Sequence, residues 1–384
     1  GLPLEGVRVL ELGTVISGPS AGSMLADLGA EVIKIETPGK GDVQRHGGLN
    51  KNGIHPWWGV AGRNKKFMTL NLKYPEGKVI FKRLIGQADV LIENYRPGAL
   101  EKLGFGWNAV HVMNPRLVML SISGYGNSGP SAGRPGFGKI AEGLSGAVTM
   151  TGSPDDPPLL IGFSLADSCT GLFGVFGIVL GLYHRDIQRG NGVMIDLALY
   201  EPLFRMLECQ LALYQNAGVP PKRQGTNDGY GWGLSSSSRP EFRCLQANTG
   251  EWFLASIPVP DELKKLMGFD SGAHDPLVAW AAKIDPVTLR QQLMQAGADI
   301  VPVLDGMTLS KNEYLRARGD VLDAFHPQLG ALSVPGPIVP IVAQGDPRVA
   351  YHDNVLGEHT DQILASHLGL AGPEIAKLKS QGVI

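Results

Sequence analysis

The sequence predicts an α/β fold in which helices cover a mostly parallel β-sheet. From residue 7 to residue 126, short apolar runs typical of strands alternate with helical patterns, and this alternation is typical of βαβ units. The chain has 384 residues, of which 43% are hydrophobic. That length supports a large buried core and favours two domains over one.

The regular elements begin near the start of the chain. In order, we expect a strand at 7–12 (VRVLEL), a helix at 19–28, a strand at 31–36 (EVIKIE), a helix at 76–87, a strand from Asp89 (DVLIENY) and a strand from Arg116 (RLVMLSISGYG). Glycines follow the last run and mark its end as a turn.

A long uncharged run from Ser168 to Tyr183 comes directly after Asp167. A membrane-spanning helix needs roughly 20 apolar residues, and this run is shorter and has no aromatic girdle. Its glycines recur every three or four residues, which lets another backbone approach one helix face closely. We therefore expect a buried helix in a large domain and no membrane partner.

Asp167 has two compatible interpretations. An aspartate in front of a helix is a favoured N-cap, and its replacement by alanine then costs about 1 kcal/mol. A helix N-terminus also keeps a carboxylate ionised, and therefore nucleophilic.

The character of the sequence changes near residue 218. Before this point, "GVMIDLALYEPLFRMLECQLALYQ" from Gly192 reads as a strand that passes into a long amphipathic helix. The following "GVPPKRQGTNDGYGWGLSSSSRP" is typical of a linker or mobile loop. Beyond it we expect a strand at "GEWFLASI", short helices in 275–320, a proline-broken connection at "VPGPIVPIV" and two short helices at the end.

Charge and composition exclude several functions. The net charge is −2, so nothing indicates a nucleic-acid partner. The three cysteines have no CxxC spacing, and the nine histidines show no HxxxH or HExxH pattern; we expect no metal site and a structural role for His359. The opening "GLPLEGVRVLELG" has no signal-peptide pattern. A cytoplasmic protein is the expectation.

Two ligand signals remain ambiguous in the α/β segment. The glycines at 13, 18 and 22 do not form G-x-G-x-x-G, so NAD(P) binding is the weaker interpretation of the first βαβ unit. Basic residues gather near the ends of expected strands, where α/β folds bind ligands. They suit either a phosphate-bearing ligand or a solvated face: Arg63, Lys65, Lys66, Lys73, Arg96 and Lys102.

Several segments together resemble the class III CoA-transferase family, also called CaiB/BaiF. These are "LPLEGVRVLELGTVISGPSAGSMLADLGAEVIKIETPGKGD", "NKKFMTLNLKYPEGK", "ADVLIENYRPGALEKLGFGW", "NPRLVMLSISGYGNSGP", "LSGAVTMTG", "LADSCTGLFGVFGIVLGLYHR" and "LGEHTDQIL". They stand in the family's order and cover residues 2–200 densely and the last 50 residues well.

The resemblance implies a fold and an assembly. A large Rossmann-like domain would be built from both chain ends, with a smaller α+β domain from the middle. The implied boundaries are 1–205 for the first part of the large domain, 206–240 for a linker and small-residue loop, 241–325 for the small domain and 326–384 for the return. Two subunits would interlock as a homodimer.

The resemblance also implies the chemistry. Coenzyme A would pass from an acyl-CoA to a free small carboxylic acid through a covalent intermediate on Asp167, with CoA esters as substrates and no tightly bound cofactor. The implied CoA-binding residues are Ile16, Ser17, Leu70, Asn71, Lys73, Asn94 and Tyr95, with Arg96 and Lys102 as further cations. A glycine-rich lid of the family would correspond to Gly233–Ser238, which here has one glycine and four serines.

Two alternatives differ in activity. A 2-methylacyl-CoA racemase of the same family would use a histidine in a GHD-type motif, but Phe137 stands at that position between Gly136 and Gly138, and phenylalanine carries no proton. A non-catalytic CoA-binding protein is the other alternative. Five aromatic residues would either line an apolar acyl pocket or belong to the core: Trp57, Trp58, Phe137, Tyr230 and Trp232.

Overall fold

The computed structural model describes residues 1–51, 53–208, 210–218, 220, 222–225, 241–257, 275–337 and 355–384. Contacts divide the chain into two compact units. The large unit consists of Gly1–Ser145, Gly162–Met206 and Glu313–Ile384, and the small unit of Gly146–Ile161 and Leu207–Asn312. The domain boundaries inferred from the sequence stay a prediction.

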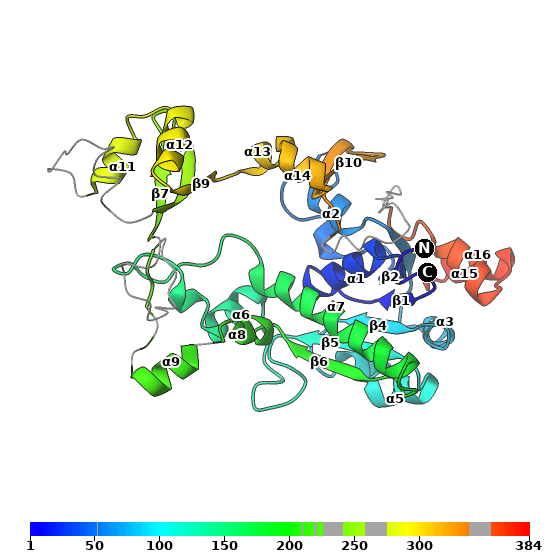
Figure 1. Cartoon of the computed structure of the whole chain (residues 1–384). Helices are drawn as coiled ribbons and strands as arrows, with labels where there is room; N and C mark the ends of the chain where they lie inside the picture. The colour runs from blue at the N-terminus through cyan, green and yellow to red at the C-terminus, as the bar shows by residue number, and fades with distance from the viewer. Residues whose placement is uncertain are drawn as a thin grey trace. The chain divides into compact units, whose positions relative to one another are not determined.

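A six-stranded parallel sheet forms the centre of the large unit (Figure 1). Its strands are β1 (Arg8–Glu11), β2 (Glu31–Glu36), β3 (Lys65–Thr69), β4 (Val90–Glu93), β5 (Val118–Ser123) and β6 (Met194–Ala198). The spatial order β3-β2-β1-β4-β5-β6 is that of Rossmann-type folds, which bind ligands at the carboxyl ends of the strands where the order reverses. The predicted α/β class with a parallel sheet is confirmed.

Helices surround this sheet. Within the large unit they are α1 (Ser17–Asp27), α2 (Pro56–Ala61), α3 (Pro75–Ile85), α4 (Ala99–Leu103), α5 (Trp107–Met113), α6 (Gly138–Ser145), α7 (Leu165–Asp186), α8 (Glu201–Met206), α14 (Glu313–Arg318), α15 (Thr360–Leu368) and α16 (Gly372–Ser380), with a 3-10 turn at Val43–Arg45. The hairpin of β10 (Val321–His326) and β11 (Gly330–Pro335) completes the unit.

The end of the chain packs into the core of the large unit. Ile363, Leu364 and Val383 are buried in the same cluster as β1, β2 and α3 side chains. His359 accepts a hydrogen bond from the backbone N–H of Phe67 at 3.1 Å, and its own N–H bonds the Phe67 carbonyl at 2.8 Å. The predicted structural role of His359 is therefore confirmed.

Helix α7 packs one glycine-rich face against the sheet. A Cβ at Gly174 or Gly181 would press on Leu120 or Val118 of β5, so the glycines permit this close approach. Among the described helices, α7 alone is long and apolar enough to cross a membrane, and 44% of its most apolar window is buried in the unit. The expected buried helix is confirmed only in part, because one face of α7 is buried against the sheet and the opposite face is exposed in the single chain.

Two element predictions are wrong. The segment around Lys65 was expected only as a basic cluster, but it forms β3 at the sheet edge, where Phe67 and Met68 are fully buried. The single long helix after β6 is two helices, α8 and α9 (Gln210–Ala217). Helix α8 buries Pro202 and Leu203, whereas α9 buries no side chain among its described residues, so the two have no common apolar face.

The small unit is built on a three-stranded antiparallel sheet with the order β7-β8-β9. Its elements are a 3-10 turn at Val148–Met150, α9, β7 (Glu241–Gln246), β8 (Trp252–Ile257), α11 (Pro276–Ala281), α12 (Pro286–Gln295), β9 (Asp299–Pro302) and α13 (Gly306–Lys311). Asp275 and Asp285 cap α11 and α12 by accepting backbone N–H bonds, each in front of a proline at N1. The predicted strand at "GEWFLASI" is confirmed as β8.

Candidate active site

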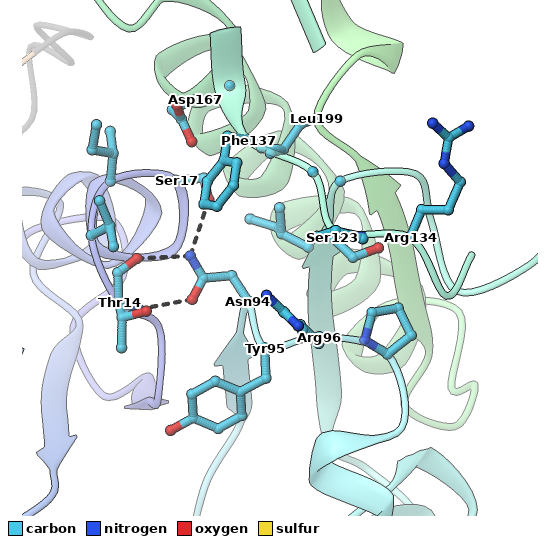
Figure 2. Close-up of a pocket in the computed structure, with 18 of the residues that line it drawn as sticks. Thr14, Ser17, Asn94, Tyr95, Arg96, Ser123, Arg134, Phe137, Asp167 and Leu199 are labelled. Atoms are coloured by element: carbon cyan, nitrogen blue, oxygen red, sulfur yellow. Dashed lines mark hydrogen bonds between the residues drawn. The ribbon is translucent and has the colours of Figure 1, made fainter. Parts of the chain in front are cut away.

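A cavity of about 350 Å³ lies at the carboxyl ends of β1, β4 and β5 (Figure 2). It is lined by the loop after β1, the turn after β4, the end of β5, a loop that enters α6, and the first turn of α7. These residues are Thr14–Ser17, Asn94–Pro97, Ile122–Gly124, Arg134–Lys139, Asp167 and Leu199. The position between β1 and β4 is the point where the strand order reverses, which is the expected ligand site of such a sheet.

Asp167 supplies the one carboxylate of the described cavity lining. It is not the helix cap: the N-cap of α7 is Ser164, and Asp167 lies three residues later in the first turn, with no side-chain cap bond at this end. The predicted capping role is therefore wrong, and the cost of losing a cap does not apply. No residue that the structure describes donates a hydrogen bond to this carboxylate.

Gly138 brings the start of α6 against Asp167. A Cβ at position 138 would overlap Oδ2 of Asp167, so only glycine lets the two helix ends approach in this way. The carboxylate therefore lies beside the first turns of both α6 and α7. Helix N-termini favour a negative charge, yet burial outweighs that contribution here.

Burial is the main reason why the pKa of Asp167 rises to about 6, and the charge of Glu142 raises it further, whereas Lys139 lowers it. Glu142 is fully buried and accepts two hydrogen bonds from Lys139 Nζ, at 3.0 and 2.9 Å. At pH 7 the Asp167 carboxylate is ionised but poorly solvated, which is the condition of a reactive nucleophile.

Asn94 orders the loop between β1 and α1. Its Oδ1 accepts the N–H of Thr14 at 2.7 Å, and its Nδ2 donates to the Thr14 carbonyl at 2.8 Å and to Ser17 Oγ at 3.2 Å (Figure 2). The side chain thereby joins the ends of β1 and β4 at the mouth of the cavity.

Glu93 supports the neighbouring turn. This buried carboxyl accepts the backbone N–H of Tyr95 at 2.8 Å and a short hydrogen bond from Ser121. Burial raises the pKa of Glu93 to about 7. Glu93 therefore holds the start of the Tyr95–Pro97 turn that lines the cavity.

The structure brings together part of the predicted CoA-binding set. Ile16, Ser17, Asn94, Tyr95 and Arg96 line the cavity with Asp167. The others do not line it: Leu70 is buried in the core, Asn71 and Lys73 follow β3 at the same edge of the sheet, and Lys102 is exposed on α4. The predicted lid, Gly233–Ser238, and the aromatic residues Tyr230 and Trp232 lie outside the described residues.

The basic cluster at 63–66 binds protein carboxylates. Lys65 is 1% exposed and pairs with Glu11 at 2.8 Å. Arg63 is paired with Asp27, and Lys66 with Glu31. For these three residues a phosphate site is wrong, because each is held in an ion pair of the fold. Arg63 and Lys65 are also buried, which excludes a solvated face for them, whereas the Lys66 side chain is 34% exposed.

Gly138, Lys139 and Glu142 were not found from the sequence. The Lys-Glu pair at i, i+3 in "GKIAEG" was a usable signal, since such residues lie on one helix face. Its proximity to Asp167 depends on a contact between residues far apart in the chain. In the described residues no cluster of three or more His, Cys, Asp or Glu side chains could hold a metal ion.

The parallel sheet and its acid-bearing cavity define a Rossmann-like α/β protein with a ligand site at the switch point. The family model for CoA-transferase family III matches residues 4–360. The chain is similar to succinyl-CoA–D-citramalate CoA-transferase of Chloroflexus aurantiacus, with 33% identity over 100% of this chain and 98% of that protein. It is similar to formyl-CoA:oxalate CoA-transferase of Streptomyces avermitilis, with 30% identity over 99% of each chain.

A solved structure gives the same result. A CaiB/BaiF family protein from Brucella suis superimposes with a TM-score of 0.81 and 29% identity, over 95% of this chain and 99% of that one. The chain belongs to CoA-transferase family III, the CaiB/BaiF family, and is a CoA-transferase.

Proposed function

We propose that this enzyme transfers coenzyme A from an acyl-CoA to a free carboxylic acid through a covalent intermediate on Asp167. The observation that carries this proposal is the isolated Asp167 carboxylate in the cavity, with its raised pKa and no hydrogen-bond donor among the described residues. A carboxylate of this kind can attack a thioester.

The cycle balances without water, protons or electrons. Asp167 attacks the thioester carbonyl of the donor, the C–S bond breaks, and CoA departs as a thiolate. The donor acyl group is then joined to Asp167 as a mixed anhydride. The thiolate attacks the Asp167 carbonyl and releases the donor acid as a carboxylate, which leaves a β-aspartyl-CoA thioester. The acceptor carboxylate then attacks the carbonyl of the aspartyl thioester, which forms a second mixed anhydride and releases the CoA thiolate again. The thiolate attacks the acceptor carbonyl of this anhydride, which forms the new CoA ester and restores the Asp167 carboxylate.

We propose a short dicarboxylic acyl-CoA, such as succinyl-CoA, as the donor. Arg96 and Arg134 line the cavity and supply guanidinium groups that can pair with a second carboxylate. A relative is named for succinyl-CoA. The test is a transfer assay with succinyl-CoA and a panel of free acids, followed by chromatography of the CoA esters; formation of a new CoA ester supports the proposal, and its absence with every acid contradicts this donor.

The geometry disfavours the racemase alternative. Phe137 lines the cavity at the position of the expected histidine, and no histidine is among the described lining residues. A second base for proton exchange is therefore missing there. Exchange of the α-proton of a branched acyl-CoA in heavy water would favour the racemase instead.

The pH profile of transfer should have an acidic limb near pH 6. The reactive form is the carboxylate, and the pKa of Asp167 is raised to about 6, so kcat/KM should rise with pH through this value and level off above pH 7. Initial rates with subsaturating donor between pH 4.5 and 8 measure this. A limb near the ordinary aspartate pKa would contradict the assignment.

Glu142→Gln should move the same limb to lower pH. The charge of Glu142 raises the pKa of Asp167, whereas burial remains, so the limb should fall without reaching the ordinary value of 3.8. A limb that belongs to Glu93 would stay in place, because the charges that raise the pKa of Glu93 are those of Glu101 and Asp196.

We also propose a homodimer in which α7 packs against the partner subunit. The face of α7 that turns away from the sheet exposes large apolar side chains: Leu172, Phe176, Val179, Leu180 and Tyr183. A continuous apolar face of this kind is typical of a protein interface.

Phe176→Glu should therefore shift the protein from dimer to monomer. A charge at the centre of an apolar interface is strongly unfavourable, and Phe176 is 62% exposed in the single chain. The matched control is Val112→Glu on α5, where the side chain is 82% exposed. Sedimentation velocity measures both; a dimer that tolerates Phe176→Glu as well as Val112→Glu would contradict this interface.

A further inference from the structure

Val15 has an unusual backbone conformation at the mouth of the cavity. Its φ is +65°, in the left-handed region, and outside glycine only Asn64 and Arg189 share a positive φ among the described residues. This region is unfavourable for a β-branched side chain. The Val15 side chain is 45% exposed, so side-chain packing does not explain why the turn is kept.

Asp42 holds the Val15 backbone from one side. Its Oδ1 accepts the N–H of Val15 at 3.1 Å and the N–H of Gln44 at 3.0 Å. Its Oδ2 forms an ion pair with Lys34 Nζ at 2.9 Å, and the Asp42 side chain is fully buried. A carboxylate that is fixed in this way is a rigid acceptor for the strained residue.

Lys34 connects this acceptor to the end of β1. Its Nζ donates to the Gly13 carbonyl at 2.6 Å and to Glu11 at 3.0 Å, and the side chain is 1% exposed. Asn94 holds Thr14 and Ser17 from the other side. The loop from Gly13 to Ser17 is therefore fixed at both flanks by buried or half-buried polar groups.

The fixed turn shapes the cavity. Val15, Ile16 and Ser17 line it together with Asp167, and Ser17 is the first residue of α1. A change of φ at Val15 would reorient the peptide planes that follow, and with them the N–H groups at the start of α1. Such N–H groups are donors for the anionic or carbonyl oxygen of a ligand.

We infer that Asp42 is a positioning residue: together with Lys34 it fixes Val15 in the left-handed conformation and thereby places Ile16 and Ser17 for contact with the bound CoA ester. The inference rests on the proposed function, since it takes the cavity to be the CoA site. The competing explanation is that the buried Lys34–Asp42 pair only stabilises the fold.

Three variants separate these explanations: Asp42→Ala, Val15→Gly and the double variant. Without Asp42, the valine turn should relax, and the Kd for CoA and the KM for the acyl-CoA donor should rise about tenfold, within the range seen for directly coupled residues. Glycine takes a positive φ without steric cost. Val15→Gly in the Asp42→Ala background should therefore recover most of the lost affinity for CoA. If the buried ion pair only stabilises the fold, Val15→Gly should recover nothing, because glycine does not replace the ion pair.

Asp89→Ala is the matched control. Asp89 pairs with Arg185 at 2.8 Å and lies at the amino end of β4, on the sheet edge opposite the cavity. The Asp89→Ala substitution should lower the melting temperature without changing the Kd for CoA. If Asp42→Ala does not fold, Asp42→Asn separates the explanations in another way, because its amide oxygen can still accept the Val15 N–H bond while the ion pair with Lys34 is lost. The Kd for CoA should then stay close to the wild-type value although the melting temperature falls, and a Kd about tenfold weaker in Asp42→Asn would overturn the positioning role.

Calorimetric titration with CoA measures binding in the absence of turnover. Wild-type affinity in Asp42→Ala, or a double variant as weak as the single one, would overturn the positioning role. A wild-type enzyme that binds CoA but transfers none would contradict the proposed function and leave the binding comparison intact. A wild-type enzyme that does not bind CoA would overturn both.

Discussion

Asp167→Asn is expected to lower kcat for CoA transfer by about 10⁴-fold or more, the scale seen when a covalent nucleophile is removed. An amide of nearly the same shape cannot attack a thioester, so no aspartyl thioester forms. The binding of CoA should change little, because the substitution keeps the volume of the side chain. Steady-state transfer and calorimetric titration measure the two effects separately. Transfer above about 1% of the wild-type rate would contradict the role of Asp167.

The same variant should be more stable than the wild-type enzyme at neutral pH. The pKa of Asp167 in the folded protein is raised from 3.8 to about 6. Its contribution to stability is therefore fully present below pH 3.8 and is lost as the pH rises through about 6. A neutral amide avoids that loss, so the melting temperature of Asp167→Asn should exceed that of the wild type at pH 7.5 and approach it at pH 4.

Gly138→Ala is expected to lower kcat by about 100-fold, the loss that a displacement of about 1 Å causes in a reacting group. The new Cβ would overlap Oδ2 of Asp167, so the carboxylate or the start of α6 must move. The KM for the donor should change less than kcat, because the added methyl group would displace the reacting carboxylate itself.

Gly143→Ala is the control for this substitution. It lies on the same helix, it is exposed, and a Cβ there would meet no atom within 4 Å. Alanine favours a helix over glycine by roughly 1 kcal/mol, so this variant should be at least as stable as the wild type and fully active. Equal activity of the two alanine variants would contradict the close approach of α6 to the nucleophile.

The sequence was sufficient for the elements whose pattern is local. The strands at β1, β2, β4 and β5 are apolar runs bounded by turns, and the parallel order follows from their alternation with helices. Asp167 stood out because it directly precedes a long uncharged run with regularly spaced glycines. The turn after β4 was found because strand ends bind ligands in such sheets.

The remainder depends on contacts between distant residues. β3 was missed because Lys65 and Lys66 give it a polar sequence, and Lys65 is buried only because Glu11 faces it from β1. The approach of Gly138 to Asp167 joins positions 29 residues apart, and the hydrogen bond from Val15 to Asp42 joins positions 27 residues apart. No local pattern encodes these pairs.

The role of the glycines after β1 also depends on contacts that no local sequence pattern predicts. Their spacing weakened the dinucleotide interpretation, but no pattern in the sequence explained why glycine occupies these positions. In the structure Gly13 and Gly18 pack Cα against Cα, and a Cβ at Gly22 would overlap the Glu11 carboxylate. They allow α1 to approach the end of β1 and its buried charges, a packing role that needs no pyrophosphate.

The most direct test of the proposed mechanism is a mass spectrum of the enzyme after brief incubation with succinyl-CoA, quenched in acid and read at the peptide that carries Asp167. We expect that peptide to gain the mass of coenzyme A minus one water, as a β-aspartyl-CoA thioester requires; the adduct should be absent in Asp167→Asn and lost on addition of an acceptor acid. Turnover of succinyl-CoA to a new CoA ester with no adduct on this peptide, or with the adduct on another residue, would contradict it.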